Sequence, residues 1–104
     1  MLDALAAQTV PDRLEVVIVD IAGNTPERLA VAPSLRHTYA VRPDINRWGR
    51  ARAEGVRLAT GPVVGFIEDH CFPRPDWAEI LLEAYREPWD VVGYAFTNAS
   101  IRFD

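Results

Sequence analysis

Hydrophobic and polar positions follow each other along this chain as short apolar runs separated by amphipathic stretches. Residues 16–19 and 63–67 contain no polar position, which is typical of strands that are buried on both faces of a parallel sheet. Residues 37–42 alternate between polar and apolar positions and predict a further strand, and residues 91–96 predict the last one. The alternation of strands with helical stretches predicts an α/β fold with a mostly parallel sheet flanked by helices.

Helices are predicted between these strands. One lies at the start of the chain and ends near Gln8. A short one begins at Pro26, where the missing N–H of proline costs nothing, with Thr25 as its cap. The next covers residues 47–59 and follows Asn46, a residue type that caps helices well. Its small residues fall four apart and form a face that can approach a sheet closely, namely Ala51, Gly55 and Ala59.

The last predicted helix follows Pro73 and Pro75 and ends before Pro88. Asp76 and Glu79 have the spacing of a capping box, in which two side chains bond free N–H groups of the first turn. An apolar stripe at helical spacing continues along this helix and consists of Trp77, Ile80, Leu81, Ala84 and Tyr85. No internal repeat or linker divides the chain, so a single domain is predicted.

Composition agrees with the predicted single domain and excludes several classes of protein. The 104 residues are 49% hydrophobic and 25% charged, which suits one globular domain and argues against disorder. No apolar run approaches the roughly 20 residues that a membrane helix needs, and residues 1–7 carry no export signal. The one cysteine, Cys71, excludes an internal disulfide and a multi-cysteine zinc site and fits a reducing compartment. A cytoplasmic protein is therefore expected.

Charge narrows the classes of function further. All 11 basic residues are arginine, against 15 acidic residues, which gives a net charge of −4. This balance argues against nucleic acid as a partner, because binding of phosphates needs a basic face. The absence of lysine excludes the phosphate-binding loop with its Gly-Lys pair and any Schiff-base mechanism. The Gly-x-Gly-x-x-Gly motif of dinucleotide-binding folds is also missing from the sequence.

Acidic residues follow two of the predicted strands. Asp20 ends the first, and Glu68, Asp69 and His70 come directly after residues 63–67. Ligands of open parallel sheets bind beyond the carboxyl ends of the strands, so these two segments are expected to meet at one edge of the sheet. Carboxylates and an imidazole suit a divalent cation such as manganese, which would neutralise a diphosphate. The alternative is that all four side chains are ordinary solvated turn residues.

Arginines gather in and just before the predicted helix over residues 47–59. They outnumber the acidic residues of the same stretch, Asp44 and Glu54, by five to two. Such a group either faces an anionic ligand or forms the solvated face of a helix, and the sequence leaves both interpretations open. The group consists of Arg42, Arg47, Arg50, Arg52 and Arg57.

Four stretches of the chain, in this order, resemble the family 2 glycosyltransferases. The first is the Leu-x-x-Leu-x-x-Gln pattern of residues 2–8, and the second is the run Glu-Val-Val-Ile-Val-Asp at residues 15–20. The third, residues 49–61, reads Gly-Arg-Ala-Arg-Ala-Glu-Gly-Val-x-x-Ala-Thr-Gly. The fourth, residues 64–77, contains Glu-Asp-His followed by Cys-Phe-Pro-Arg-Pro-Asp-Trp. Together the four stretches cover nearly the whole chain, and they are more specific as a set than singly.

The resemblance implies a GT-A fold, which is Rossmann-like. It also implies transfer of a sugar, with inversion, from a nucleotide-diphosphate sugar to an acceptor hydroxyl. The nucleotide-sugar site would then include Asp20, which contacts the nucleoside in that family, and Arg47, whose position faces the nucleotide. Arg52 matches the arginine of the family's Ala-Arg-Asn motif.

A cation site is implied by the same resemblance. The family's Asp-x-Asp motif holds a divalent cation, Mn²⁺ or Mg²⁺, at the diphosphate of the donor, and it falls on Glu68, Asp69 and His70. Asp69 would thereby also belong to the nucleotide-sugar site. The chain departs from the family at His70 itself, at Ile21, where a second acid is usual, and at Ala53, where an asparagine is usual.

Under this resemblance, residues 1–104 form a single partial domain, the donor-binding half of a glycosyltransferase, incomplete at both ends. The family's first strand would precede Leu2, and its acceptor site and general base would follow residues 91–96. No residue is identified as that base, so the isolated chain is expected to be a poor catalyst or none. Two other functions stay open: a non-catalytic module that binds a nucleotide or a protein partner, and an interaction fragment whose acidic residues are ordinary surface groups.

Overall fold

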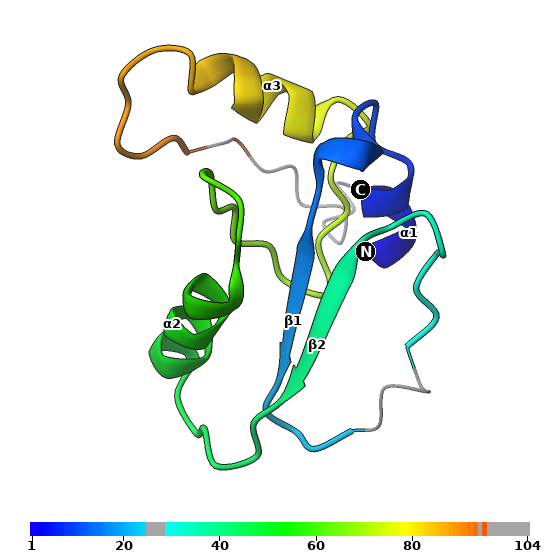
Figure 1. Ribbon diagram of the computed structural model, residues 1–104, viewed down its shortest axis with the longest axis vertical. Helices are drawn as coiled ribbons and strands as arrows, with labels where there is room; N and C mark the ends of the chain where they lie inside the picture. Colours follow the sequence, from blue (N-terminus) through cyan, green and yellow to red (C-terminus); the bar gives the residue numbers. More distant parts are fainter. Residues whose placement is uncertain (25–28, 94, 96–104) are drawn as a thin grey trace, which may run out of the picture.

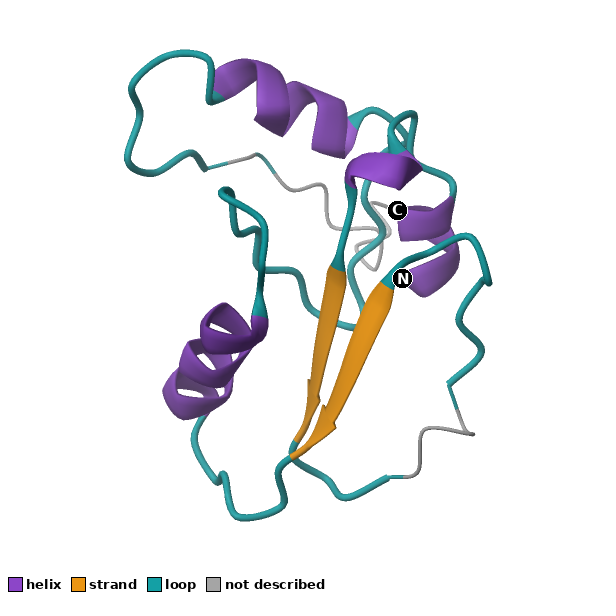
Figure 2. Ribbon diagram, in the orientation of Figure 1, coloured by secondary structure: helices purple, strands orange, loops and turns teal. Residues whose placement is uncertain are grey.

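Six short elements make up the described part of the computed structural model, which covers residues 1–24, 29–93 and 95. The short helix predicted at Thr25 and Pro26 lies outside these residues. In chain order the elements are α1 (Leu2–Ala6), the 3₁₀-helix η1 (Pro11–Arg13), β1 (Val16–Asp20), β2 (His37–Val41), α2 (Trp48–Leu58) and α3 (Trp77–Ala84) (Figures 1 and 2).

β1 and β2 form a parallel sheet, as the sequence predicts. Their register pairs Val16 with His37 and Asp20 with Val41. All five residues of β1 are half-buried, whereas the apolar run predicts a strand that is buried on both faces. The predicted burial is wrong because the sheet has only two strands in the described part of the chain, so one edge of β1 has no neighbouring strand.

The strand predicted over residues 63–67 is not formed. This segment is irregular, as are residues 91–93 of the last predicted strand, most of whose remaining residues are not described. An apolar run becomes a strand only when a neighbour completes its backbone hydrogen bonds, and among the described residues β1 pairs with β2 alone. Glu15 holds Thr60, which lies just before this segment, because its carboxylate accepts hydrogen bonds from the N–H and the hydroxyl of Thr60 at 3.0 and 2.7 Å.

α2 lies beside β1 (Figure 1) and packs its small residues against the strand, as predicted. Ala51 is buried, and a Cβ atom at Gly55 would lie 3.7 Å from Cγ2 of Val19. Arg47 occupies the cap position with an extended backbone, and no side chain caps the first turn. The cap predicted at Asn46 is therefore wrong, because the helix begins after Arg47 and Asn46 lies one residue too early to bond its free N–H groups.

The N-terminus of α3 is capped by a side chain from the other end of the chain. Oε1 of Gln8 accepts a hydrogen bond from the N–H of Ala78 at 2.9 Å. Nε2 of the same side chain donates to the carbonyl oxygens of Arg74 at 2.7 Å and Ala4 at 3.0 Å. One buried amide thus joins α1 to the segment that leads into α3.

The capping box predicted for Asp76 and Glu79 is consequently wrong. The carboxylate of Asp76 accepts a hydrogen bond from the guanidinium of Arg74 at 3.1 Å, and Glu79 accepts one from the hydroxyl of Thr9 at 2.8 Å. Neither carboxylate bonds the free N–H groups of the first turn. One of these groups, the N–H of Ala78, donates instead to Gln8.

The core is small and is made largely of short side chains. The predicted stripe of α3 is only partly directed inward, since Ile80 is 55% exposed while its neighbour Ala78 is buried. No described helix is long and apolar enough to cross a membrane. The buried apolar residues of the described chain are Leu5, Leu35, Ala40, Ile45, Ala51 and Ala78. Large apolar side chains that stay exposed include Trp48, Phe66, Phe72, Trp89 and Val91.

Candidate functional site

The carboxylate of Asp20, at the end of β1, is held by four hydrogen bonds. Oδ1 accepts from the backbone N–H groups of Ala22 at 2.8 Å and Gly23 at 3.1 Å, and from the side-chain amide of Asn24 at 3.4 Å. Oδ2 accepts from the hydroxyl of Tyr39. Gly23 has a φ of 75°, which glycine adopts without strain, so the loop turns sharply after the strand and returns its N–H groups to the carboxylate.

These donors keep Asp20 ionised. The hydrogen bond from Tyr39 is the largest cause that holds the pKa of Asp20 below its ordinary value of 3.8. Partial burial acts in the opposite direction, and the donors at Ala22, Asn24 and Gly23 outweigh it together with Tyr39. The carboxyl end of β1 therefore carries a fixed, oriented negative charge.

Tyr39 is the residue of this site that sequence reasoning misses. In the parallel register Tyr39 lies opposite Ile18, and Asp20 lies two residues further along β1. Side chains two residues apart share a face of the sheet, so the side chains of Tyr39 and Asp20 lie on the same face. The alternating pattern of residues 37–42 contains this signal, but it becomes readable only once the register between the two strands is known.

α2 begins at the end of the molecule where β1 and β2 finish (Figure 1). Arg47 immediately precedes α2, and its exposed side chain forms no hydrogen bond or ion pair with any residue that the structure describes. Arg47 therefore belongs to the segment that connects the end of β2 to α2, at the end of the sheet where β1 finishes with Asp20. This is the place where the resemblance expects a nucleotide.

Two other arginines of the predicted group pair with an acid of the same chain. Arg42 and Arg57 both contact Glu54, with guanidinium nitrogens 2.8 Å from its carboxylate oxygen. Hydrogen bonding from Arg57, and then from Arg42, lowers the pKa of Glu54 to about 2 although partial burial opposes this change. For these two arginines the structure favours a structural role between β2 and α2.

Glu68, Asp69 and His70 lie together in an exposed turn. The His70 ring has Nε2 at 3.2 Å from a carboxylate oxygen of Glu68 and Nδ1 at 3.2 Å from one of Asp69. Arg52 of α2 lies 3.7 Å from Glu68, and its guanidinium carbon stands 5.9 Å from the ring centre of Phe66. The structure thus brings Arg52 to the three residues that the sequence assigns to a cation.

The donor types of this turn suit a divalent cation, because carboxylate oxygens and imidazole nitrogens are ligands of manganese-like ions. The side chains of Glu68, Asp69 and His70 are 59%, 97% and 75% exposed, so an ion can reach all three. Within the described ranges, however, no three His, Cys, Asp or Glu side chains are arranged to hold a metal ion. Each ring nitrogen faces a carboxylate, so these side chains would have to turn to share an ion.

Asp20 and the turn at residues 68–70 form two separate groups. In the described part of the chain no hydrogen bond or ion pair connects them. Asp69 lines a pocket of about 310 Å³ together with the start of α1 and with Leu29 and Ala30, and Asp20 is not among the lining residues. That both groups contact one ligand stays a prediction.

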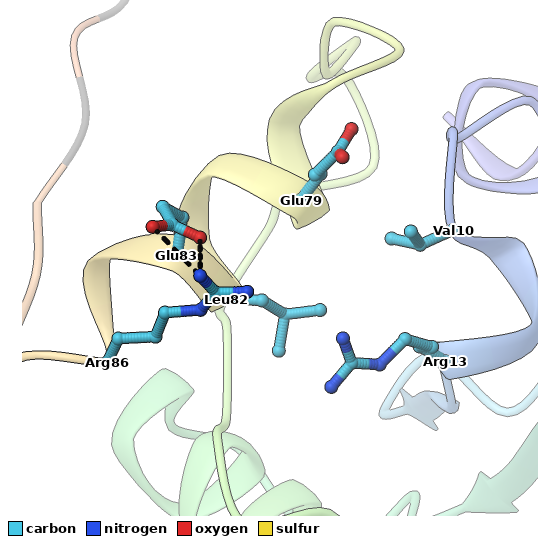
Figure 3. A pocket seen from close by; sticks show the side chains of 6 residues that line it. All are labelled: Val10, Arg13, Glu79, Leu82, Glu83 and Arg86. Atoms are coloured by element: carbon cyan, nitrogen blue, oxygen red, sulfur yellow. Dashed lines mark hydrogen bonds and ion pairs between the residues drawn. The ribbon is translucent and has the colours of Figure 1, made fainter.

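Another pocket, of about 270 Å³, lies between η1 and α3 (Figure 3) and contains none of the predicted site residues. Arg86 points back to Glu83, with their charged atoms 3.0 Å apart, while Arg13 extends toward the pocket from the opposite wall. No sequence signal predicts this pocket, because its two walls come from segments far apart in the chain. It is lined by Val10, Arg13, Glu79, Leu82, Glu83 and Arg86.

Known proteins support the resemblance that the sequence motifs carry. The chain is similar to the glucosyl-dolichyl phosphate glucuronosyltransferase of Haloferax volcanii, with 33% identity over 99 residues. The match covers 91% of this chain and 31% of that protein, so the chain spans about a third of its relative's length. No solved structure matches the chain significantly. The family model described as glycosyl transferase family 2 matches residues 1–103, and the chain therefore belongs to this family.

Proposed function

We propose that this chain supplies the donor-binding part of an inverting glycosyltransferase, which transfers a sugar from a nucleotide-diphosphate sugar to an acceptor hydroxyl. Membership of the family supports glycosyl transfer in general. The observation that supports the donor site is the ionised carboxylate of Asp20, which accepts four hydrogen bonds. It lies at the carboxyl end of a parallel strand, where ligands of such sheets bind. A complete GT-A fold around this strand belongs to the same proposal.

Asp20 and Arg47 contact the nucleotide in the proposed site. Asp20 accepts a hydrogen bond from the nucleoside, and the guanidinium of Arg47 pairs with a phosphate, for which its planar group of donors is well suited. Arg47 is supported in this role by its exposure and by its free guanidinium, which no described acid neutralises.

Glu68, Asp69 and His70 are the proposed ligands of the divalent cation, Mn²⁺ or Mg²⁺. When bound, such a cation neutralises the charge that develops on the departing diphosphate. Asp69, whose carboxylate is almost fully exposed, also borders the nucleotide sugar in this proposal. Arg52 contacts Glu68 from α2 and holds the turn beside that helix, while its own charge faces the same site.

We propose the sugar and the acceptor by similarity to the relative described above. The name of the Haloferax volcanii protein makes a glucuronosyl donor and a glucosyl-dolichyl phosphate acceptor the first substrates to test. Inverting transfer also needs a general base that takes the proton of the acceptor hydroxyl. None of the residues above is assigned that role.

Titration calorimetry of the full chain tests the donor site, with uridine diphosphate and guanosine diphosphate as probes in the presence and absence of Mn²⁺. We expect Mn²⁺-dependent binding of at least one probe, and loss of that binding when Asp69→Ala and His70→Ala are combined. Glu83→Ala is the matched control, since it removes another exposed, paired carboxylate on α3. If the wild-type chain binds neither probe, with or without the metal, the proposed donor site is refuted.

Turnover separates an enzyme from a binding module. A labelled nucleotide sugar and a lipid-linked acceptor are incubated with the chain, and a labelled glycoside is the product that an enzyme would form. Because the isolated chain is expected to be a poor catalyst or none, formation of a glycoside is the deciding outcome and would show an enzyme, whereas nucleotide binding alone agrees with both the donor-binding part and a non-catalytic module.

A further inference from the structure

Tyr39 has no role in the proposed function so far, yet its hydroxyl donates directly to the donor carboxylate. It lies in β2, is half-buried, and its hydroxyl donates to Oδ2 of Asp20 on the neighbouring strand. The parallel register places both side chains on one face of the sheet, so this contact follows from the backbone and does not depend on a flexible loop.

The two oxygens of Asp20 have different surroundings. Oδ1 accepts three hydrogen bonds from the loop that follows the strand, from Ala22, Gly23 and Asn24, and these occupy its lone pairs. Oδ2 accepts the bond from Tyr39 and keeps a second lone pair, since a carboxylate oxygen can accept two bonds. Oδ2 is therefore the atom of this carboxylate that keeps hydrogen-bonding capacity for a ligand.

Charged groups do not fix Oδ2. No basic side chain of the described residues forms an ion pair with Asp20. Arg42, whose backbone N–H donates to the Asp20 carbonyl oxygen at 2.7 Å, directs its guanidinium to Glu54 of α2. Among the described residues Tyr39 is thus the hydrogen-bond donor to Oδ2, and it fixes the plane of the carboxylate together with the loop bonds to Oδ1.

We infer that Tyr39 is a positioning residue of the donor site: its hydroxyl holds Oδ2 of Asp20 in the direction in which that oxygen accepts a hydrogen bond from the nucleoside. This inference rests on the proposed function. The lowered pKa of Asp20, for which Tyr39 is the main cause, agrees with it because the accepting oxygen stays ionised.

The test compares Tyr39→Phe with the wild type in the full chain, again with uridine and guanosine diphosphate and Mn²⁺. Loss of one hydrogen bond to a charged group predicts about tenfold weaker binding. Tyr85→Phe, which removes a hydroxyl at the end of α3, is the matched control and should bind as the wild type does. Carbon-13 NMR of the Asp20 carboxyl group should show a higher pKa in Tyr39→Phe only.

A double-mutant cycle separates positioning from a purely structural role. In an Asp20→Ala background, Tyr39→Phe should weaken binding no further, whereas a purely structural effect would appear in both backgrounds. Wild-type affinity in Tyr39→Phe, or an equal loss in both backgrounds, overturns the inference while the proposed function stands.

If Tyr39→Phe does not fold, NMR of the wild-type chain is the test. Bound nucleotide should shift the Asp20 Cγ and Tyr39 Cζ resonances, and unchanged resonances refute the inference. A wild-type chain that binds neither nucleotide refutes both proposals.

Discussion

The amide of Gln8 is 4% exposed and satisfies three backbone groups at once, on Ala4, Arg74 and Ala78. A buried donor or acceptor that loses its partner costs far more than the net contribution of one hydrogen bond. At the scale of single residues, this side chain therefore matters more for stability than its polar character suggests. Its position at the end of the first predicted helix gave no indication of a contact across the molecule.

Gln8→Ala should lower the free energy of unfolding by about 2 kcal/mol, because the N–H of Ala78 and the carbonyl oxygen of Ala4 lose their side-chain partner and the carbonyl oxygen of Arg74 keeps only its bond from the N–H of Trp77. Gln8→Glu keeps the size of the side chain but cannot donate to the two carbonyl oxygens, so it should be destabilising as well. Thr9→Val, which removes the neighbouring exposed bond to Glu79, should change stability by roughly 0.5 kcal/mol. Urea denaturation measures all three, and a Gln8→Ala chain as stable as Thr9→Val would contradict the prediction.

The candidate site was predictable at the level of single residues but not of contacts. Acids that close apolar runs identified Asp20, Glu68 and Asp69, since residue type and position relative to a strand are visible in a sequence. Tyr39 was missed, because its contact with Asp20 depends on the register between two strands. The Gln8 cap was missed for a similar reason: its partners lie 66 and 70 residues away.

Glu54 is the connection between β2 and α2 at the scale of elements. Its carboxylate contacts Arg42, just after β2, and Arg57, one turn further along α2. The small face of α2 was predicted correctly from the spacing of Ala51 and Gly55, because helical periodicity is a local property. The start of α2 was predicted less well, since a shift of one residue moves the cap position from Asn46 to Arg47.

Acid should weaken this connection. The pKa of Glu54 lies at about 2 in the folded chain against an ordinary 4.5, so its contribution to stability is complete above pH 4.5 and is lost as the pH falls toward 2. The urea midpoint of the wild type should fall through this window, and Glu54→Gln should reduce the slope. Arg57→Gln removes the largest cause of the shift and raises the folded pKa of Glu54, so the loss should be smaller and should be complete at a higher pH. Equal slopes for the wild type and Glu54→Gln would show that the pair contributes nothing.

Gly55→Ala should stabilise the chain by about 1 kcal/mol. A helix interior favours alanine over glycine by roughly that amount, and the added Cβ would meet Val19 at 3.7 Å, an ordinary contact distance. Gly55→Leu is the contrasting variant, since its larger side chain would push α2 away from β1 and should destabilise. Thermal unfolding followed by circular dichroism measures both, and a lower melting temperature for Gly55→Ala would show that the helix lies closer to the strand than this distance implies.

At the scale of the whole molecule, the α/β class and the parallel pairing were predictable, while the extent of the sheet was not. Hydrophobic runs show that a segment prefers burial, but pairing needs a partner strand, and residues 63–67 find none in the described chain. The same shortage of partners leaves large side chains at the surface. Phe72 and Val91 are 75% and 83% exposed, and Trp89 is 62% exposed.

This surface predicts self-association of the chain as its concentration rises, because exposed apolar side chains attract a second copy, as does the edge of β1 that no described strand pairs with. Sedimentation velocity over a range of concentrations measures it. Trp89→Ser combined with Val91→Ser should reduce the association, since it removes two of the most exposed apolar groups. A chain that stays monomeric at every concentration would contradict this expectation.

The contact between Gln8 and the residues that lead into α3 determines the order in which parts of the chain can fold during synthesis. During synthesis α1 leaves the ribosome well before its partners, which follow 66 and 70 residues after Gln8. Closing so long a loop is costly in entropy and must precede the packing that rewards it. A nascent chain that stalls before Arg74 would therefore leave α1 without its partner, so α1 docks only after Arg74 and Ala78 have been made.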